Sequence, residues 1–288
     1  MLYLRQVRPV HQARRFFVRN TAVADDGSDL FGSAPYYSTH LGVVVETPAA
    51  RWPAQLTDFT EDNVDEYGAR QLQHVQEQVQ ALRRPGPLRL PNTKVTAIDA
   101  SVLTECAEDL FGGDVLVFPD NVLVRGTIGD AKMTKLLEAL AESQLDWNKP
   151  LQNESSADNG NWKRKFDPFD KVLTKHEFKR LSQTVLVCAH AQRDVHCRRC
   201  GGPTLQVISR HVDNNDVAED TMVLATSHVG GHKYAPCILT YPSGNWYGLV
   251  EPQELPELLT TEAKGGTYWH KWRGRAGTTR RQYADLIE

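Results

Sequence analysis

The chain has 288 residues, of which 40% are hydrophobic and 24% are charged, and its formal net charge at pH 7 is −3. This length suffices for two domains with separate cores, and the composition is that of an ordinary globular protein. The charge balance argues against a general nucleic-acid binder, and no apolar run approaches the roughly 18 residues that a membrane-spanning helix needs.

The first 24 residues differ in composition from the rest of the chain. They contain leucine, valine and phenylalanine among five arginines, and no acidic residue. The arginines are Arg5, Arg8, Arg14, Arg15 and Arg19. This composition is typical of a mitochondrial presequence, with a disordered basic tail as the alternative. We therefore expect residues 1–24 to direct the protein to mitochondria, and to the matrix rather than the intermembrane space.

The part of the chain from residue 35 to residue 147 is predicted to alternate strands and helices. Runs of β-branched and other apolar residues predict strands at 40–46 and 95–98. Apolar residues at helical spacing predict a surface helix over 62–83, which a Pro-Gly-Pro run ends. A further helix is expected over 101–111.

An internal repeat links the two halves of the chain. Residues 114–126, DVLVFPDNVLVRG, resemble residues 237–248, CILTYPSGNWYG, and a helical segment with a leucine doublet follows each. Each copy is an apolar run that ends in an aromatic residue and proline, then a tight turn and a second strand. A duplicated domain explains this most economically; chance similarity between two hairpin-plus-helix units is the alternative.

The second half begins after a polar segment that is rich in Asn, Ser, Asp and Gly, and we expect a linker over 148–165. Beyond it, apolar runs predict strands at 184–187 and 222–226. A helix from near Pro203 to Val212 would connect these two strands as parallel neighbours.

This order of elements is β-α-β followed by β-β-α, which resembles a thioredoxin-like sandwich. The sequence therefore predicts an α/β protein of two tandem thioredoxin-like domains, the first over 35–147 and the second over 166–288.

Cysteines and histidines follow the two strands that are expected in the second half. Cys188 and Cys197 enclose a polar loop after the first strand, and His228 and His232 follow the second. Two thiolates and two imidazoles suit a soft or borderline metal, and they are also the donor types of a Rieske-type two-iron cluster. The Gly-Gly pair between the histidines would let the backbone pass close to a bulky cofactor. This segment lacks the glutamate of H-E-x-x-H, which argues against a zinc protease.

A third cysteine, Cys200, lies three residues after Cys197. The run C-R-R-C-G-G-P precedes the expected helix, as in a thioredoxin-type dithiol, and a helix N-terminus with flanking arginines lowers a thiol pKa. Cys200 is therefore an alternative ligand, a resolving thiol or an inert residue. The chain has five cysteines, three of them clustered, which indicates a metal or redox site in a reducing compartment.

The other cysteines and two more histidines are weaker ligand candidates. Cys106, on an expected helix, and Cys237, at a strand start, are typical of small buried residues. His190 and His196 lie inside the loop between the ligand cysteines. We expect both histidines to support the ligands from behind or to face solvent.

Several motifs together resemble the sucrase/ferredoxin-like family. They are CAHAQRDVHC at 188–197, SHVGGHKYA at 227–235, NWYG at 245–248 and WRG at 272–274, with HLGVVVET, WP and VLVFPD in the first half. The resemblance covers most of the chain, from about Pro35 to Gly274. It implies a thioredoxin-like ferredoxin with a [2Fe–2S] cluster. The ligands that it implies are Cys188, Cys197, His228 and His232.

Three functional hypotheses follow. The leading one is a one-electron carrier, rather than a turnover enzyme, that serves unknown donor and acceptor proteins. The second is a thiol–disulfide oxidoreductase that uses Cys197 and Cys200, and the third is a structural zinc protein. The first domain lacks both the cysteine pair and the histidine pair, so we expect it to be a structural or docking copy without a cluster.

Overall fold

The computed structural model describes residues 29–100, 109–147, 162–214, 221–279 and 282. The expected presequence, Cys106 and most of the expected linker lie outside these residues, as does most of the helix expected over 101–111. No helix in the described ranges is both long and apolar enough to cross a lipid bilayer.

The two halves of the chain repeat one order of elements. The first half contains β1 (Thr39–Val45), α2 (Glu66–Arg83), β2 (Thr93–Asp99), β3 (Val115–Phe118), β4 (Val122–Val124) and α3 (Asp130–Ser143). The second half contains β8 (Gln183–Cys188), α5 (Val195–Asn214), β9 (Thr221–Thr226), β10 (Ile238–Tyr241), β11 (Asn245–Tyr247) and α6 (Leu255–Ala263). The remaining helix and strands are β5 (Leu145–Asp146), β6 (Lys163–Arg164), α4 (Pro168–Val172), β7 (Phe178–Arg180) and β12 (Trp272–Arg275). The strands and the repeated hairpin predicted from the sequence are therefore present.

Ten of the strands form one sheet, in the order β12-β11-β10-β8-β9-β2-β1-β3-β4-β7. Within each half the first two strands are parallel, and the first strand of the hairpin pairs antiparallel with the first strand of that half. The halves join between β2 and β9, where Ile98 pairs with Thr226. The mixed α/β class is confirmed, whereas the division into two tandem domains stays a prediction, since the sheet is continuous across this junction.

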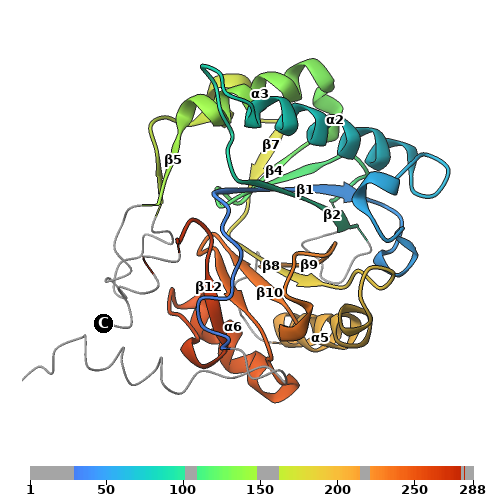
Figure 1. Cartoon of the computed structure of the whole chain (residues 1–288), viewed down its shortest axis with the longest axis vertical. Coiled ribbons are helices and arrows are strands. Elements are labelled where there is room, and N and C mark those ends of the chain that lie inside the picture. The colour runs from blue at the N-terminus through green and yellow to red at the C-terminus, as the bar shows by residue number, and fades with distance from the viewer. Residues whose placement is uncertain (1–28, 101–108, 148–161, 215–220, 280–281, 283–288) are drawn as a thin grey trace, which may run out of the picture.

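Helices cover the outer faces of the sheet. In Figure 1, α2 and α3 lie above the strands of the first half, and α5 and α6 lie below those of the second. In β1 the side chains of Leu41, Val43 and Val45 belong to the apolar cluster that includes residues of these helices, whereas Val44 belongs to a second cluster. That alternation is the period of a strand covered on both faces.

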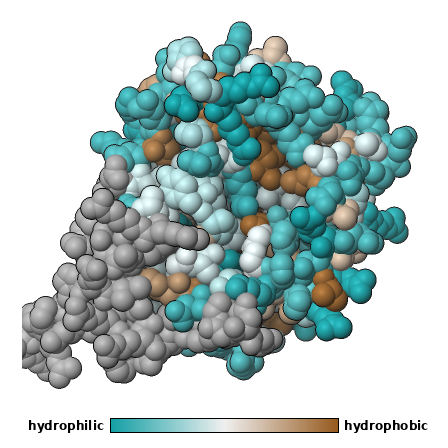
Figure 2. Space-filling model, in the orientation of Figure 1, coloured by the Kyte–Doolittle hydropathy of each residue, from teal (hydrophilic) through white to brown (hydrophobic). Residues whose placement is uncertain are grey.

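The second cluster packs the two half-sheets against each other. It combines inner-face residues of both halves, for example Leu116 and Phe118 with Leu224 and Leu239. Polar contacts cross here too, since the Thr184 hydroxyl donates to the Asn121 side-chain oxygen over 2.8 Å. The visible face of the molecule is mainly hydrophilic, with apolar residues mostly in hollows between hydrophilic side chains (Figure 2).

Two predicted helix starts are wrong: α2 begins at Glu66 and not at residue 62, and α5 begins at Val195 and not near Pro203. Asp194 starts this helix: its carbonyl oxygen accepts from the N–H of Arg198 over 3.1 Å, and its Oδ1 accepts from the N–H of His196 over 2.8 Å. Gly201 lies where a Cβ would be 2.6 Å from the carbonyl oxygen of Cys188. Its role is therefore close packing of α5 on the end of β8, and not the breaking of a helix.

Candidate metal centre

The fold brings the expected cysteines to the end of β8. Cys188 is the last residue of β8, and His228 comes two residues after the end of β9. Because these strands are parallel and Cys188 is in register with Thr226, both side chains leave the same edge of the sheet. Cys197 lies in the first turn of α5, which packs against the same two strands.

Three potential ligand atoms meet at this edge. The Sγ atoms of Cys188 and Cys197 are 3.1 Å apart, and the Nδ1 atom of His228 lies 3.9 Å from the first and 3.6 Å from the second. Both cysteines are buried and His228 is half-buried. Among the described residues this is the one cluster of Cys, His or acidic side chains found with the geometry to hold a metal ion.

The two thiols differ sharply in acidity. The hydrogen bond that the sulfurs share, together with His228, holds the pKa of Cys188 well below its ordinary value, although burial opposes this. The same hydrogen bond raises the pKa of Cys197, because a proton there is shared with a neighbouring thiolate. Of the two thiols, Cys188 is therefore the one that loses its proton more easily, and a bound metal would displace the protons that remain on the pair.

His232, the fourth expected ligand, lies beside the group and outside it. Its side chain is 53% exposed, and its Nδ1 atom lies 3.5 Å from a carboxylate oxygen of Asp194. The ring centroid is 6.1 Å from that of His228 and 6.0 Å from that of the exposed His196. The structure therefore brings three of the four expected ligands together and leaves His232 at the adjacent surface.

His190 is buried next to the site and is hydrogen-bonded to the backbone of His228, so it does not face solvent. It is 1% exposed, its Nε2 atom lies 2.7 Å from the carbonyl oxygen of Pro53, and its Nδ1 atom accepts from the backbone N–H of His228 over 3.3 Å. Burial lowers its pKa, which favours the neutral ring that both contacts require.

The two other described cysteines, Cys200 and Cys237, are not part of this group of ligand atoms. Cys200 is half-buried one turn further along α5. Cys237 is buried, as expected from the sequence; burial raises its pKa to about 12, against the opposing effect of Arg273. The Nη1 atom of Arg273 donates to its sulfur over 3.2 Å.

Two cations lie near the centre, of which Arg273 is buried and Lys94 is half-buried. Lys94 in β2 donates to the carbonyl oxygen of Val229 over 2.9 Å. Burial lowers its pKa to about 8, and the negative charge of Cys188 opposes that shift. Arg273 is 1% exposed and lies over the ring of Tyr234. The WRG motif pointed to Arg273, but no sequence signal distinguished Lys94 from a surface lysine.

The donor set fits a thiolate- and imidazole-binding metal. With bond lengths of about 2.3 Å to sulfur and about 2.0 Å to nitrogen, a tetrahedral ion separates its sulfur donors by about 3.8 Å and nitrogen from sulfur by about 3.5 Å. The two nitrogen–sulfur distances, 3.9 and 3.6 Å, are near the tetrahedral value, whereas the two sulfurs, 3.1 Å apart, are closer together than one such ion would hold them. In a two-iron cluster with separate cysteine and histidine irons, His228 would have to move outward, toward His232.

One pocket lies beside His228. This pocket, of about 230 Å³, is lined by His228, His190 and Arg193 together with residues 54–57 of the first half.

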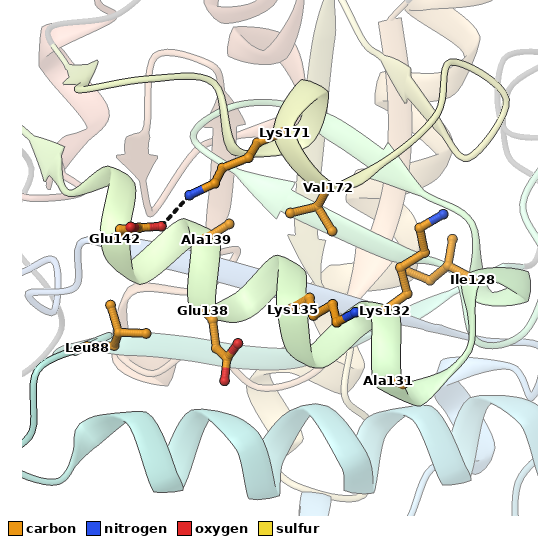
Figure 3. Close-up of a pocket in the computed structure, with 10 residues that line it drawn as sticks. All are labelled: Leu88, Ile128, Ala131, Lys132, Lys135, Glu138, Ala139, Glu142, Lys171 and Val172. Atoms are coloured by element: carbon orange, nitrogen blue, oxygen red, sulfur yellow. Dashed lines mark hydrogen bonds and ion pairs between the residues drawn. The ribbon is translucent and has the colours of Figure 1, made fainter.

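A second hollow, of about 680 Å³, lies over α3 and α4 and contains lysines, glutamates and aliphatic residues (Figure 3). An ion pair between Lys171 and Glu142 crosses it at 2.5 Å, and neither a cysteine nor a histidine lines it.

A family model, described as sucrase/ferredoxin-like, matches residues 30–274. The chain belongs to the sucrase/ferredoxin-like family. The resemblance noted in the sequence is thereby confirmed, and the match includes both halves of the sheet and all four expected ligands.

Curated relatives include two yeast proteins named altered inheritance of mitochondria protein 32. The protein from Clavispora lusitaniae is 27% identical over 179 residues, which is 60% of this chain and 58% of that protein. The one from Debaryomyces hansenii is 27% identical over 164 residues, 53% of this chain and 55% of that protein. The matched segments thus span little more than half the length of these relatives.

Two matches to Aquifex aeolicus cover smaller parts of the chain. A protein named "Ferredoxin, 2Fe-2S" is 33% identical over 46 residues, 16% of this chain and 41% of that protein. The structure of a thioredoxin-like [2Fe–2S] ferredoxin aligns with 34% of this chain and 94% of its own, at 19% identity and a TM-score of 0.30. That score is too low for a conclusion about function.

Proposed function

We propose that this protein is a mitochondrial electron carrier whose [2Fe–2S] cluster is held by Cys188, Cys197, His228 and His232. The observation that carries the proposal is the buried meeting of Cys188, Cys197 and His228 at one edge of the sheet, in a member of the sucrase/ferredoxin-like family. When bound, such a cluster supplies one-electron transfer at a potential raised by its neutral imidazole ligands.

The protein groups divide the work of binding. Cys188, whose pKa is lowered, gives up its proton more easily than Cys197, whose pKa is raised. His228 presents Nδ1 to the sulfurs and so keeps its N–H on Nε2. His232 is at the surface, where its ring can meet both solvent and a partner protein.

The compartment and the domain plan are parts of the same proposal. The arginine-rich composition of residues 1–24 and the names of the yeast relatives both support mitochondria. The equal order of strands in the two halves supports two thioredoxin-like units, of which the second provides the ligands. The donor and acceptor proteins are unidentified.

A single zinc ion is the second candidate, and the position of His228 favours it. The distances from the His228 nitrogen to the two sulfurs, 3.9 and 3.6 Å, are close to those around one tetrahedral ion. For a dithiol mechanism, the structure favours Cys188 over the expected Cys200 as the second thiol, because the sulfur that is hydrogen-bonded to Cys197 belongs to Cys188.

Purification without oxygen, followed by visible absorption, EPR of the reduced protein and analysis of iron, zinc and acid-labile sulfide, tests these alternatives. Two irons and two sulfides per chain, with a rhombic EPR signal, are the result expected. One zinc per chain in a colourless protein would establish the second candidate. A metal-free protein with a Cys188–Cys197 disulfide would establish thiol chemistry.

A further inference from the structure

The segment that carries His228 is held by strand β2 of the first half. The N–H of Ser227 donates to the carbonyl oxygen of Ala97 over 2.8 Å, and the N–H of Ala97 donates to the Ser227 hydroxyl over 3.0 Å. Ser227 is fully buried. The residue before His228 is therefore bonded in both directions to a strand of the other half.

His190 links the backbone of His228 to the same half. A carbonyl oxygen only accepts hydrogen bonds, so the His190 nitrogen facing Pro53, Nε2, carries the proton. Its Nδ1 is then a pure acceptor, which is what the N–H of His228 needs. Both contacts are satisfied by this one tautomer of a neutral ring. The chain of bonds runs from His228 through His190 to a carbonyl of the first half.

The Pro53 end of that chain is rigid. The His190 ring meets the edges of Trp52 and Phe59, with centroids 5.7 and 6.4 Å away and interplanar angles of 86° and 85°. Trp52 is fully buried, and its indole N–H donates to the carbonyl oxygen of Thr47 over 2.7 Å. Trp52 and Pro53, the WP motif of the first half, therefore hold the His190 ring in a fixed position.

Lys94 holds the residue that follows His228. Its Nζ atom donates to the carbonyl oxygen of Val229 over 2.9 Å and lies 5.8 Å from the ring centroids of Tyr37 and Trp246. Ser227, His228 and Val229 are consecutive, and each is bonded to the first half directly or through one side chain. Three successive residues fixed in this way leave the His228 backbone little freedom.

We propose that His190 and Lys94 are positioning residues through which the first half of the chain fixes where His228 presents its ring to the metal. The first half is then a working part of the centre, and not only the structural or docking copy that the sequence suggested. The inference rests on the proposed function only in that a metal is bound by His228; it does not depend on which metal that is.

Substitutions at His190 separate its two contacts. In His190→Asn the side-chain oxygen can accept from the N–H of His228, but the bond to Pro53 is lost. In His190→Gln the amide can donate to the Pro53 carbonyl, but the acceptor for His228 is lost. His190→Leu removes both contacts. We expect the two polar variants to retain part of the wild-type behaviour and His190→Leu to lower metal affinity about 10- to 100-fold. His176→Leu, at an exposed histidine, is the matched control.

The readout is the nitrogen hyperfine coupling of the histidine ligands, measured by pulsed EPR of the reduced protein beside the metal content. The wild type and His176→Leu should give one well-defined set of couplings, and His190→Leu a shifted and broadened set. Lys94→Met should do the same and Lys94→Arg should restore part of it, with Lys135→Met on the outer face of α3 as the exposed control. Couplings unchanged in both His190→Leu and Lys94→Met would overturn the proposal.

A wild-type protein without an iron–sulfur signal would refute the proposed cluster and leave this inference to be decided. The same variants are then loaded with Co²⁺, whose visible d–d bands report the geometry of a thiolate and imidazole site. Altered bands in His190→Leu and Lys94→Met, but not in the two controls, would support the positioning role. Identical bands in all variants would refute it.

Discussion

Phe118 and Tyr241 stack face to face, with ring centroids 4.0 Å apart and ring planes 16° apart. They occupy equivalent places in the repeated hairpins, each as the last residue of a strand and each before a cis proline. They come from strands β3 and β10, which are not neighbours in the sheet. The stack therefore shows that the two half-sheets close on each other about their repeated elements.

The interface between the two half-sheets around Phe118 and Tyr241, called the seam below, should contribute much of the stability of the fold. Phe118 is fully buried, whereas Phe111 is 61% exposed. We expect Phe118→Ala to lower the free energy of unfolding by about 3–5 kcal/mol, because it removes a buried ring and leaves a cavity. Phe111→Ala should change it by less than about 0.5 kcal/mol. Urea unfolding measures both, and equal effects would show that the seam adds nothing.

A buried histidine makes the seam sensitive to acid. The Nδ1 and Nε2 atoms of His40 each lie 2.8 Å from a hydroxyl oxygen, of Tyr241 and Thr96 respectively. Burial, and next the charge of Lys94, hold the pKa of His40 well below its ordinary value of 6.5. Below pH 6.5 the unfolded chain binds a proton that the folded chain does not. As the pH is lowered below 6.5, the free energy of unfolding should therefore fall by up to about 1.4 kcal/mol for each pH unit.

The His40→Gln variant isolates this effect, because glutamine can hydrogen-bond but does not titrate. The groups that face His40 include Tyr37, Tyr241 and Lys94. Burial raises the pKa of Tyr241 well above its ordinary value, and the pKa of Lys94 is about 8, so these two groups keep their protons over this range. The difference in unfolding free energy between wild type and His40→Gln should shrink as the pH falls from 7 to 5. The exposed His176→Gln should show no such trend. A difference that is constant with pH would mean that His40 titrates normally.

Sequence reasoning located the centre because its main signal is local. Cys188 and His228 each follow an apolar run, and the ends of parallel strands meet at one edge. The start of α5 was missed, because Gly201, Gly202 and Pro203 carry a breaker signal although Gly201 in fact permits close packing. The partners of His190 and Lys94 could not be found in this way: Pro53 is 137 residues from His190, and Val229 is 135 residues from Lys94.

Cys200 distinguishes the ligand hypotheses. It lies outside the group formed by Cys188, Cys197 and His228 among the described residues. Cys200→Ser should therefore keep the metal content and the spectrum of the wild type. Cys188→Ser and Cys197→Ser should lose or grossly change both, because each removes a thiolate donor. Metal analysis and visible absorption decide the matter, and equal loss in all three variants would require a different ligand assignment.

The histidine ligands give the most specific prediction for the proposed cluster. An imidazole that binds iron through one nitrogen keeps an N–H on the other, whereas a bound thiolate has no proton left. Oxidation of the iron makes that N–H more acidic. The midpoint potential should therefore be constant at low pH and fall as the pH rises through the pKa of the oxidised state, with a slope approaching roughly 59 mV per pH unit.

Ligand exchange tests the origin of that slope. Replacing His228 or His232 by cysteine adds a negative charge, so the potential should fall, and it removes one ionisable N–H, so the pH dependence should flatten. His196→Cys, at the exposed histidine beside His232, changes neither quantity if His196 is no ligand. Protein-film voltammetry from pH 6 to pH 11 measures both. A potential that stays flat over this range in an intact wild-type cluster would show that His228 and His232 are not its ligands.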